Sequence, residues 1–217
     1  MLGSKYCFSM DNLRVDFRRA EEDQDDCLKL RFDANLIDFD DNDQFYEVGQ
    51  VQGAILNLPE FSGTGIDQIF CLEVLNCECA YNALAPLYDE KGTLDSRKWK
   101  TVGGTLRKNR VIYIEKVSVN PRFASRNLGA CLLFSTLQLI HRVIGEKAPV
   151  LAMLGSFDKK RCGTVVQRYF EQNGFKSVDE DQVSFYLPLK TIAKHLGLED
   201  VEAFHRQVKE KILTDTE

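Results

Sequence analysis

The sequence lacks several features that would assign a function directly. It contains no apolar run that approaches the roughly 18 residues of a membrane-spanning helix, and its N-terminus lacks the basic-then-apolar layout of a secretory signal. Acids outnumber lysines and arginines by 33 to 28, which argues against general nucleic-acid binding. Neither a phosphate-binding G-K-[ST] motif nor a paired-glycine dinucleotide fingerprint is found. These absences disfavour membrane proteins, nucleic-acid-binding proteins and generic nucleotide-binding proteins.

Metal-ligand spacings are missing as well. The seven cysteines are irregularly spaced and odd in number, which favours reduced thiols in a cytosolic or nuclear compartment, and we expect a cytoplasmic protein. Cys77 and Cys79 form a C-x-C pair without a second pair or a suitably spaced histidine, so two cysteines on a strand are a simpler interpretation than zinc. The three histidines are scattered, and we expect no metal site.

What the chain does contain is a succession of strand and helix patterns. The spacing of apolar residues predicts strands over 13–18, 69–75, 101–106, 111–119, 149–154, 175–178 and 183–189. It predicts two short helices within 21–39, further helices over 128–144 and 164–173, and a helical tail over 191–217. Residues 40–65 show few certain elements. This order predicts an α/β protein with a mixed sheet.

The stretch 111–140 carries the strongest functional signal. It reads as a buried strand, a short turn and an amphipathic helix with a glycine in its first turn. A helix start presents unpaired N–H groups and the positive end of the helix dipole, which together favour a phosphorylated ligand. The strand also holds a carboxylate, Glu115, which is costly in an apolar run unless it is paired, solvated or used. A cofactor-dependent enzyme is the expectation.

Three features resemble the GNAT superfamily of acyl-CoA-dependent N-acyltransferases. Residues 114–133, IEKVSVNPRFASRNLGACLL, are similar to the family's fourth strand, pyrophosphate loop and following helix. Residues 170–175, FEQNGF, are similar to its Y-E-K-x-G-F motif, and the order of elements over 11–190 matches the family order. The implied fold is a mixed central sheet flanked by helices, an α/β or more strictly α+β domain. Residues 1–10 would be a tail and 191–217 a C-terminal helical extension.

The resemblance implies acetyl-CoA as a cosubstrate, bound where the fourth and fifth strands separate. Backbone amides of Val117 and Val119 would pair with the pantetheine arm, and amides from Arg126 to Gly129 would hold the pyrophosphate. The residues that it assigns to the cofactor are Val117, Ser118, Val119, Ala124, Ser125, Arg126, Asn127, Leu128, Gly129, Ala130 and Phe170.

The chain departs from the family pattern at several of these positions. Ala124 stands where the family has Arg or Gln, and Asn127 replaces the first glycine, although Asn tolerates the left-handed backbone. Phe170 stands where family enzymes often carry a tyrosine that protonates the departing thiolate. Tyr169 is its neighbour, but one helical step is about 100° of rotation, so we expect it to face elsewhere.

Two residues are candidates for catalysis. Glu115 sits where many relatives place an acid that removes the proton of the amine, directly or through one water. Its alternatives are a carboxylate paired with Lys116 or Arg107, or one that faces a wet cleft. Tyr186 on the last strand is a secondary candidate for substrate or proton contact, and a packed aromatic is its alternative.

The acceptor is the least defined part of the prediction. Residues 21–47 contain eleven acids and two bases, so a negative rim there would attract a cationic acceptor, and a solvated acidic loop is the alternative. The leading interpretation is an N-acetyltransferase that moves an acetyl group directly from acetyl-CoA to a primary amine. The alternative is a catalytically impaired module of the same fold that binds CoA or a protein partner. The sequence leaves open whether the protein is a monomer or a homodimer.

Overall fold

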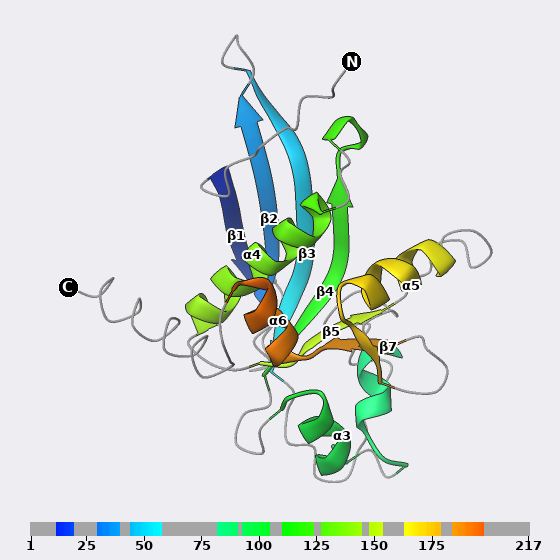
Figure 1. Cartoon of the computed structure of the whole chain (residues 1–217). Helices are drawn as coiled ribbons and strands as arrows, with labels where there is room; N and C mark the ends of the chain where they lie inside the picture. The colour runs from blue at the N-terminus through cyan, green and yellow to red at the C-terminus, as the bar shows by residue number, and fades with distance from the viewer. Residues whose placement is uncertain are drawn as a thin grey trace.

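The described residues of this computed structural model build one mixed sheet with helices on both of its faces (Figure 1). These residues are 12–19, 30–39, 44–57, 82–90, 93–104, 110–123, 127–144, 148–153, 163–178 and 184–197. The sheet has seven strands in the order β1-β2-β3-β4-β5-β7-β6. The predicted α+β class, with a mixed sheet flanked by helices, is therefore confirmed.

The element bounds are as follows. The strands are β1 Leu13–Arg19, β2 Leu30–Phe39, β3 Phe45–Asn57, β4 Arg110–Val119, β5 Val150–Met153, β6 Lys176–Ser177 and β7 Ser184–Leu187. The helices are η2 Ala85–Leu87, α3 Ser96–Thr101, η3 Pro121–Phe123, α4 Leu128–Ile144, α5 Gly163–Gln172 and α6 Leu189–His195. Strands β1 to β4 pair antiparallel, and β4 pairs parallel with β5 through the crossover that contains α4. None of the helices in the described part of the chain is long and apolar enough to cross a membrane.

The strongly periodic segments were predicted correctly. Helix α4 begins and ends at the predicted residues, β1 and β5 occupy the predicted ranges, and α5 is followed by Gly174 at φ 80°. Left-handed backbone of this kind favours glycine after a helix end. The predicted strand at 69–75 and the tail beyond residue 197 lie outside the described residues.

Two predictions near the N-terminus were wrong. The structure has the single strand β2 where helical structure was expected up to residue 39, because Phe32, Ala34 and Leu36 are buried at a period of two. Phe32 and Leu36 are also four residues apart, which fits one helical turn, so the apolar pattern was ambiguous. The long strand β3 was missed within 40–65, since its glycines and glutamines weaken a strand pattern.

A third error concerns the segment that follows. The predicted strand at 101–106 is absent over its described part, because α3 ends at Thr101 and a turn follows in which Gly103 has φ 97°. Asp95 caps α3 by accepting hydrogen bonds from the amides of Arg97 and Lys98. These two carboxylate hydrogen bonds lower the pKa of Asp95.

The core consists of two clusters on opposite faces of the sheet. The larger cluster joins β1 to β5 and β7 with α4, α5 and α6, and its fully buried side chains include Phe32, Leu36, Ile112, Leu132, Leu137 and Phe185. The smaller cluster lies on the other face, where the segment 82–104 covers the lower part of the sheet. Its members include Leu84, Leu87, Trp99, Tyr113, Leu151 and Tyr186. Ser184 ties this segment to β7 by donating a hydrogen bond to the Ala83 carbonyl at 2.7 Å.

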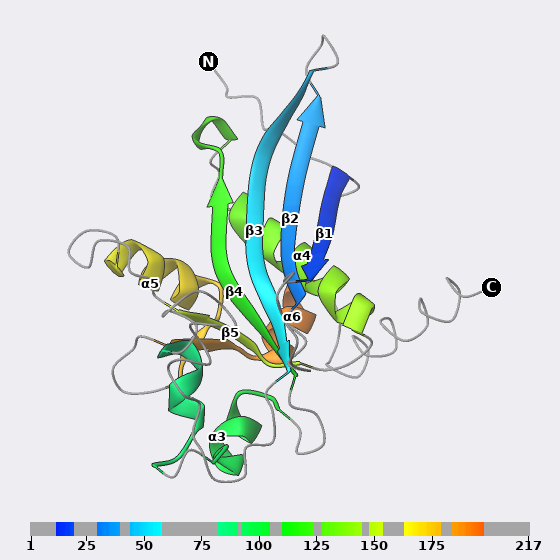
Figure 2. The same ribbon diagram turned by 180° about the vertical axis from the view of Figure 1, so that it is seen from behind.

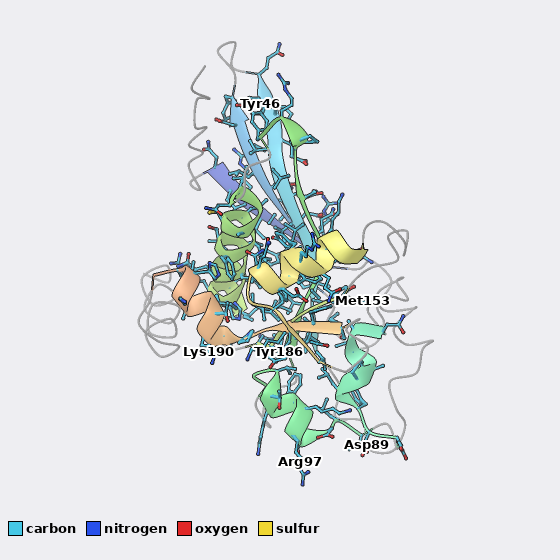
Figure 3. The ribbon with its side chains drawn as sticks, turned by 45° about the vertical axis from the view of Figure 1, so that its right-hand side comes forward. Tyr46, Asp89, Arg97, Met153, Tyr186 and Lys190 are labelled. Carbon is cyan, nitrogen blue, oxygen red and sulfur yellow. The ribbon has the colours of Figure 1, made fainter. Side chains whose placement is uncertain are left out.

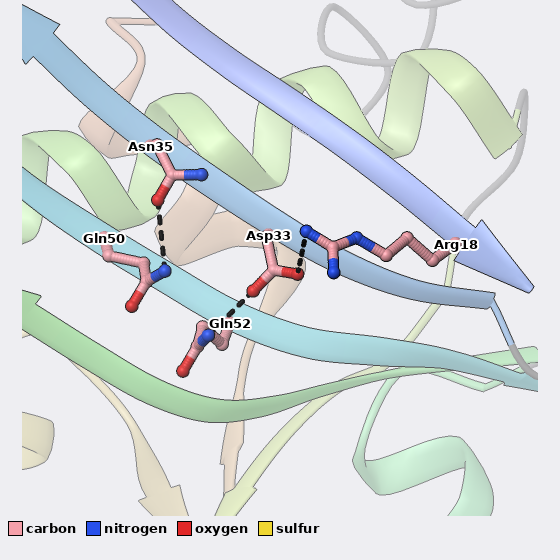
Figure 4. Close-up of polar contacts among 5 residues, drawn as sticks. All are labelled: Arg18, Asp33, Asn35, Gln50 and Gln52. Atoms are coloured by element: carbon pink, nitrogen blue, oxygen red, sulfur yellow. Dashed lines mark hydrogen bonds and ion pairs between the residues drawn. The ribbon is translucent and has the colours of Figure 1, made fainter. Parts of the chain in front are cut away.

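The upper part of β1 to β4 is covered by a helix on one face only, among the described residues (Figure 2). The other face, which we call the open face, carries polar side chains (Figure 4). Gln50 donates a hydrogen bond to Asn35 at 3.1 Å and Gln52 donates one to Asp33 at 2.7 Å. Arg18 forms an ion pair with Asp33 at 3.8 Å. The open face thus begins where the smaller cluster ends.

Candidate active site at the bulge in strand β4

Strand β4 has two halves with different neighbours. From Arg110 to Ile114 it lies between β3 and β5, and its pairing with β5 runs from Ile112 to Ile114. From Glu115 to Val119 it continues beside β3, while β5 has no further paired residue in the described part of the chain. Among the described residues, one edge of β4 is therefore open after Ile114.

A β-bulge marks the boundary between these halves. The register with β3 shifts between Gln52 and Gly53, which pair with Lys116 and Ile114, so Glu115 is the extra residue. A bulge turns two successive side chains toward the same side. Glu115 and Lys116 are accordingly both exposed, and Val117 returns to the face of α4.

Glycine permits the close contact that this bulge requires. A Cβ at Gly53 would collide with the Tyr113 carbonyl oxygen and with the ring of Phe32. The strands can approach at the bulge only because residue 53 has no side chain. Gly53 is a residue that the sequence analysis did not single out.

The direction of the β4 amides follows from the same bulge. The amide of Ile112 donates a hydrogen bond to the Pro149 carbonyl, so at this point of β4 the even-numbered amides face β5. The extra residue shifts the alternation, and the amide of Asn120 faces β3, where it donates to the Val48 carbonyl. The amides of Val117 and Val119 therefore point to the open edge, and their pairing with a pantetheine arm stays a prediction.

The chain then turns from β4 into α4. Asn120 organises this turn, because its side chain donates to the Glu47 carbonyl and accepts from the amide of Arg122. Helix α4 begins at Leu128, whose side chain is buried in the larger cluster, so only its backbone can face a ligand. Ala124, Ser125 and Arg126, three of the predicted cofactor residues, lie outside the described residues.

Gly129 in the first turn of α4 is packed between two side chains. A Cβ built there would lie 3.5 Å from Val119 Cγ2 and 3.6 Å from the Tyr169 hydroxyl oxygen. Tyr169 of α5 thus extends over the start of α4, and its hydroxyl has no hydrogen-bond partner among the described residues. Burial raises the pKa of Tyr169, so the hydroxyl keeps its proton. No sequence pattern signalled this contact, which depends on how α5 packs against α4.

An open groove of about 910 Å³ runs beside this contact. Its lining comes from α4, α5 and the residues at the end of α6: Asn127, Ala130, Cys131, Phe134, Ser135, Tyr169, Gln172, Asn173, His195 and Leu196. His195 stacks on Phe134 with ring centroids 3.9 Å apart, and Cys131 is a free, exposed thiol. Two predicted cofactor residues, Asn127 and Ala130, border the groove.

Phe170 faces away from this groove. It is 6% exposed and packs against Phe175 and Phe185, with ring centroids 4.8 Å and 5.3 Å away. The different directions of Tyr169 and Phe170 agree with the expected rotation of one helical step. The structure gives Phe170 a packing role, and its contact with a cofactor stays a prediction.

Tyr186 occupies a comparable position in the smaller cluster. Tyr186, which Figure 3 labels, is 8% exposed and lies in one cross-strand row with Leu151 and Tyr113. Tyr113 precedes Glu115 by two residues in β4. Tyr186 and Glu115 thus share a face of the sheet, but the tyrosine ring is packed. Its catalytic role also stays a prediction.

The described residues contain no group of three or more histidine, cysteine, aspartate or glutamate side chains that could hold a metal ion. The polar groups that the bulge brings together are a carboxylate, an ammonium group and two backbone amides at the open edge. This set can bind an extended chain and accept a proton.

Comparisons with known proteins give a likeness of fold. No protein-family model matches the chain, and no curated protein matches it. A solved structure described as a tyrosine-to-phenylalanine mutant of KacT has a TM-score of 0.43 and 10% identity, covering 76% of this chain and 75% of its own. A structure described as a bacterial toxin has a TM-score of 0.40 and 12% identity, covering 79% and 73%. At these values the likeness carries no argument about activity.

These comparisons correct the expectation, made from the sequence, that the chain belongs to the GNAT superfamily. Because no family model matches, the resemblance of residues 114–133 and 170–175 to GNAT motifs does not place the chain in that superfamily. The departures at Ala124, Asn127 and Phe170 are the positions where the motifs fail. The strand order, the bulge and the open edge of β4 stand on the structure itself.

Proposed function

We propose that the protein is an acyltransferase that moves an acetyl group from acetyl-CoA directly to a primary amine. The observation that carries the proposal is the bulge in β4. It places the exposed carboxylate of Glu115 beside an open strand edge, toward which the amides of Val117 and Val119 point. An extended ligand with alternating carbonyl and amide groups, such as pantetheine, can pair with such an edge as an added strand does.

The start of α4 is the corresponding site for the phosphates. It follows β4 after a short turn, and a helix start combines free amides with the positive end of the dipole. Asn127 borders the groove at this point, and Gly129 leaves space between Val119 and Tyr169. The nucleotide part would lie along the groove between α4 and α5.

Glu115 removes the proton that blocks attack by the amine. A primary amine with a pKa near 10 is protonated at pH 7 and is not a nucleophile in that form. Lys116 is exposed beside Glu115 and favours loss of this proton, because a like charge destabilises the ammonium form. Acetyl-CoA supplies the activated acyl group. The amine nitrogen forms the new C–N bond, the C–S bond breaks and the sulfur leaves as a thiolate. The nitrogen then loses its second proton, which reaches the thiolate through water.

The leaving thiolate needs no side-chain proton donor in this proposal. An unperturbed thiol has a pKa of about 8.5, so the thiolate is a stable leaving group near neutral pH and water can protonate it. This agrees with the buried position of Phe170, which brings no hydroxyl to the site.

The packing of Phe170 also favours a second candidate function. A chain whose α5 offers a packed phenylalanine in place of a donor can bind CoA or a protein partner without turnover. Turnover separates the enzyme from a module that binds CoA without reaction, and CoA binding separates both from a module that binds only a protein partner.

The test combines binding and turnover. Calorimetry with acetyl-CoA gives the Kd, and a thiol reagent follows the release of CoA in the presence of a small primary amine. We expect Glu115→Gln to lower kcat/KM by about 10²–10⁴-fold with an unchanged Kd, because general-base catalysis contributes this much. Glu90→Gln, which alters an exposed glutamate in the segment 82–104, is the matched control and should change neither.

Each outcome decides between the candidates. Binding without CoA release by the wild type would favour the binding module. Equal activity of wild type and Glu115→Gln would remove Glu115 as the base. An absence of binding at millimolar acetyl-CoA would remove the enzyme and leave a module that binds a protein partner.

A further inference from the structure

The β2–β3 hairpin ends in an exposed aromatic pair. Phe39 and Phe45 are Cα partners at the last paired position before its tip, and their side chains are 50% and 74% exposed. The other large apolar side chain with comparable exposure among the described residues is Val143 of α4, at 59%. Exposed aromatic pairs of this kind commonly mark interaction sites.

The pair lies on the open face of the sheet. The preceding cross-strand pair is Asp38 with Tyr46, and Tyr46 stacks on Phe123 and packs against the larger cluster. Side chains alternate between faces along a strand, so Phe39 and Phe45 point the opposite way. On β2 they share the face of Asn35 and Asp33, whose polar contacts Figure 4 shows.

This face connects the aromatic pair with Glu115. Gln52 is the Cα partner of Lys116 at the bulge, and Phe45 lies seven positions away along β3. At about 3.3 Å per residue the two ends are roughly 23 Å apart. The side chains on this path are Glu47, Gln50, Gln52 and Ser118, and an extended polypeptide of about seven residues spans the same length.

The hairpin has a strong excess of negative charge. Residues 30–57 contain six acids and one base, and no lysine or arginine occurs between Arg31 and Lys91. Glu47 is exposed on the face of the aromatic pair, whereas Asp38 points to the opposite face and accepts a hydrogen bond from the Tyr46 hydroxyl. Farther along the open face the charge is mixed, because Asp16, Asp33 and Glu115 share it with Arg14, Arg18, Arg31 and Lys116. The acidic excess therefore lies at the hairpin end, where it is complementary to the cationic part of a chain that also bears an apolar side chain.

We propose that the open face docks a cationic polypeptide acceptor, with an apolar side chain of the acceptor on Phe39 and Phe45 and its reactive lysine at Glu115. This inference rests on the proposed acyltransferase function and names its substrate class. The aromatic pair acts as an anchor remote from the reacting atoms, so it changes acceptor binding and leaves the chemical step unchanged.

The experiment compares peptides that differ only in spacing. Each peptide has one lysine, arginines as its other cationic residues, and one leucine placed either two or about seven residues from the lysine. With the wild type we expect the longer spacing to give at least tenfold higher kcat/KM, mainly through KM. The double variant Phe39→Ser/Phe45→Ser should abolish this preference and leave kcat/KM for a small primary amine unchanged. Val143→Ser is the matched control, since it removes an apolar side chain of similar exposure from α4.

Three results would overturn the inference. One is an equal kcat/KM for both spacings in the wild type. Another is an equal loss with peptide and small amine in the double variant. The third is a change of oligomeric state in the double variant, measured by light scattering, which would make the pair a contact between copies of this chain.

Failure of the proposed function can be distinguished from failure of this inference. If no amine is acetylated, the proposed function fails, and fluorescence anisotropy of the same labelled peptides still measures docking. If the longer-spaced peptide then binds more tightly to the wild type than to the double variant, the open face is still supported as a docking site. Equal binding would remove it.

Discussion

The two halves of β4 differ in almost every physical respect although they form one continuous strand. Arg110–Ile114 pairs with β3 along its length and with β5 from Ile112 to Ile114, and four of its five residues are buried. Glu115–Val119 has one strand partner in the described part of the chain and begins with two exposed charges. The first half holds the sheet together, and the bulge separates it from a half that is free to bind. A single extra residue thus divides a structural segment from a candidate functional one.

Core substitutions should give the largest contrast in stability between the halves. Ile112 is fully buried between β3 and β5, whereas Val117 is half-buried beyond the bulge. We expect Ile112→Ala to reduce the free energy of unfolding by about 2–5 kcal/mol, because it leaves a cavity. Val117→Ala should cost about 1 kcal/mol or less, since its site is partly open to water. Denaturant unfolding of both variants measures the difference, and equal losses would contradict the division.

Gly53 tests the bulge itself. We expect Gly53→Ala to cost about 1–3 kcal/mol, because the new Cβ collides with the Tyr113 carbonyl oxygen and the strands must separate. Gly129→Ala is the matched control, since its Cβ would meet neighbours at 3.5 Å and 3.6 Å, which is ordinary contact. In a helix this change should be neutral or stabilise by up to about 1 kcal/mol. If both variants have the same stability, the bulge does not depend on a glycine at position 53.

The secondary structure could be predicted where the apolar pattern of a segment was clear. Helix α4 was predicted because its apolar periodicity is strong, and strand β5 because it is a short continuous apolar run, which is typical of a central strand covered on both faces. Strand β2 was mistaken for helix because its buried residues also fit a helical period. Local patterns do not report which face a neighbouring element covers.

The site was predictable only in part. Glu115 was a candidate because it is a carboxylate in an apolar strand, and the resemblance to GNAT motifs implied the amides of Val117 and Val119. The structure brings these groups to one open edge, and their roles stay predictions. The bulge, the need for Gly53 and the position of Tyr169 over α4 depend on contacts between segments far apart in the chain. Such contacts leave no local pattern, so residues 111–140 alone could not predict them.

His141 of α4 makes the stability of the fold depend on pH. It is fully buried, with Nδ1 2.8 Å from the Leu137 carbonyl oxygen and Nε2 3.2 Å from that of Ala148, just before β5. Burial lowers the pKa of His141, although both carbonyls oppose this shift. Below about pH 6.5 the unfolded chain therefore binds a proton that the folded chain does not, and stability falls as the pH is lowered.

Denaturant unfolding at pH 7.5 and pH 5 checks this dependence. We expect the wild type to lose more stability over this range than His141→Gln, which cannot titrate. Burial and Lys194 also lower the pKa of His195, but His195 is exposed, so its contribution should be smaller and remains in the variant. The same pH dependence in both proteins would assign the effect to other groups.

The smallest effect is expected on the open face. Arg18 is 72% exposed and lies 3.8 Å from Asp33, which also accepts a hydrogen bond from Gln52. An exposed ion pair of this geometry contributes about 0–1 kcal/mol, since solvent screens the charges and both side chains lose freedom. We expect Arg18→Ala to change the free energy of unfolding by less than about 0.5 kcal/mol. A loss well above about 1 kcal/mol would mean that the polar contacts of this face stabilise the fold, and the face would then not be free to receive a partner chain.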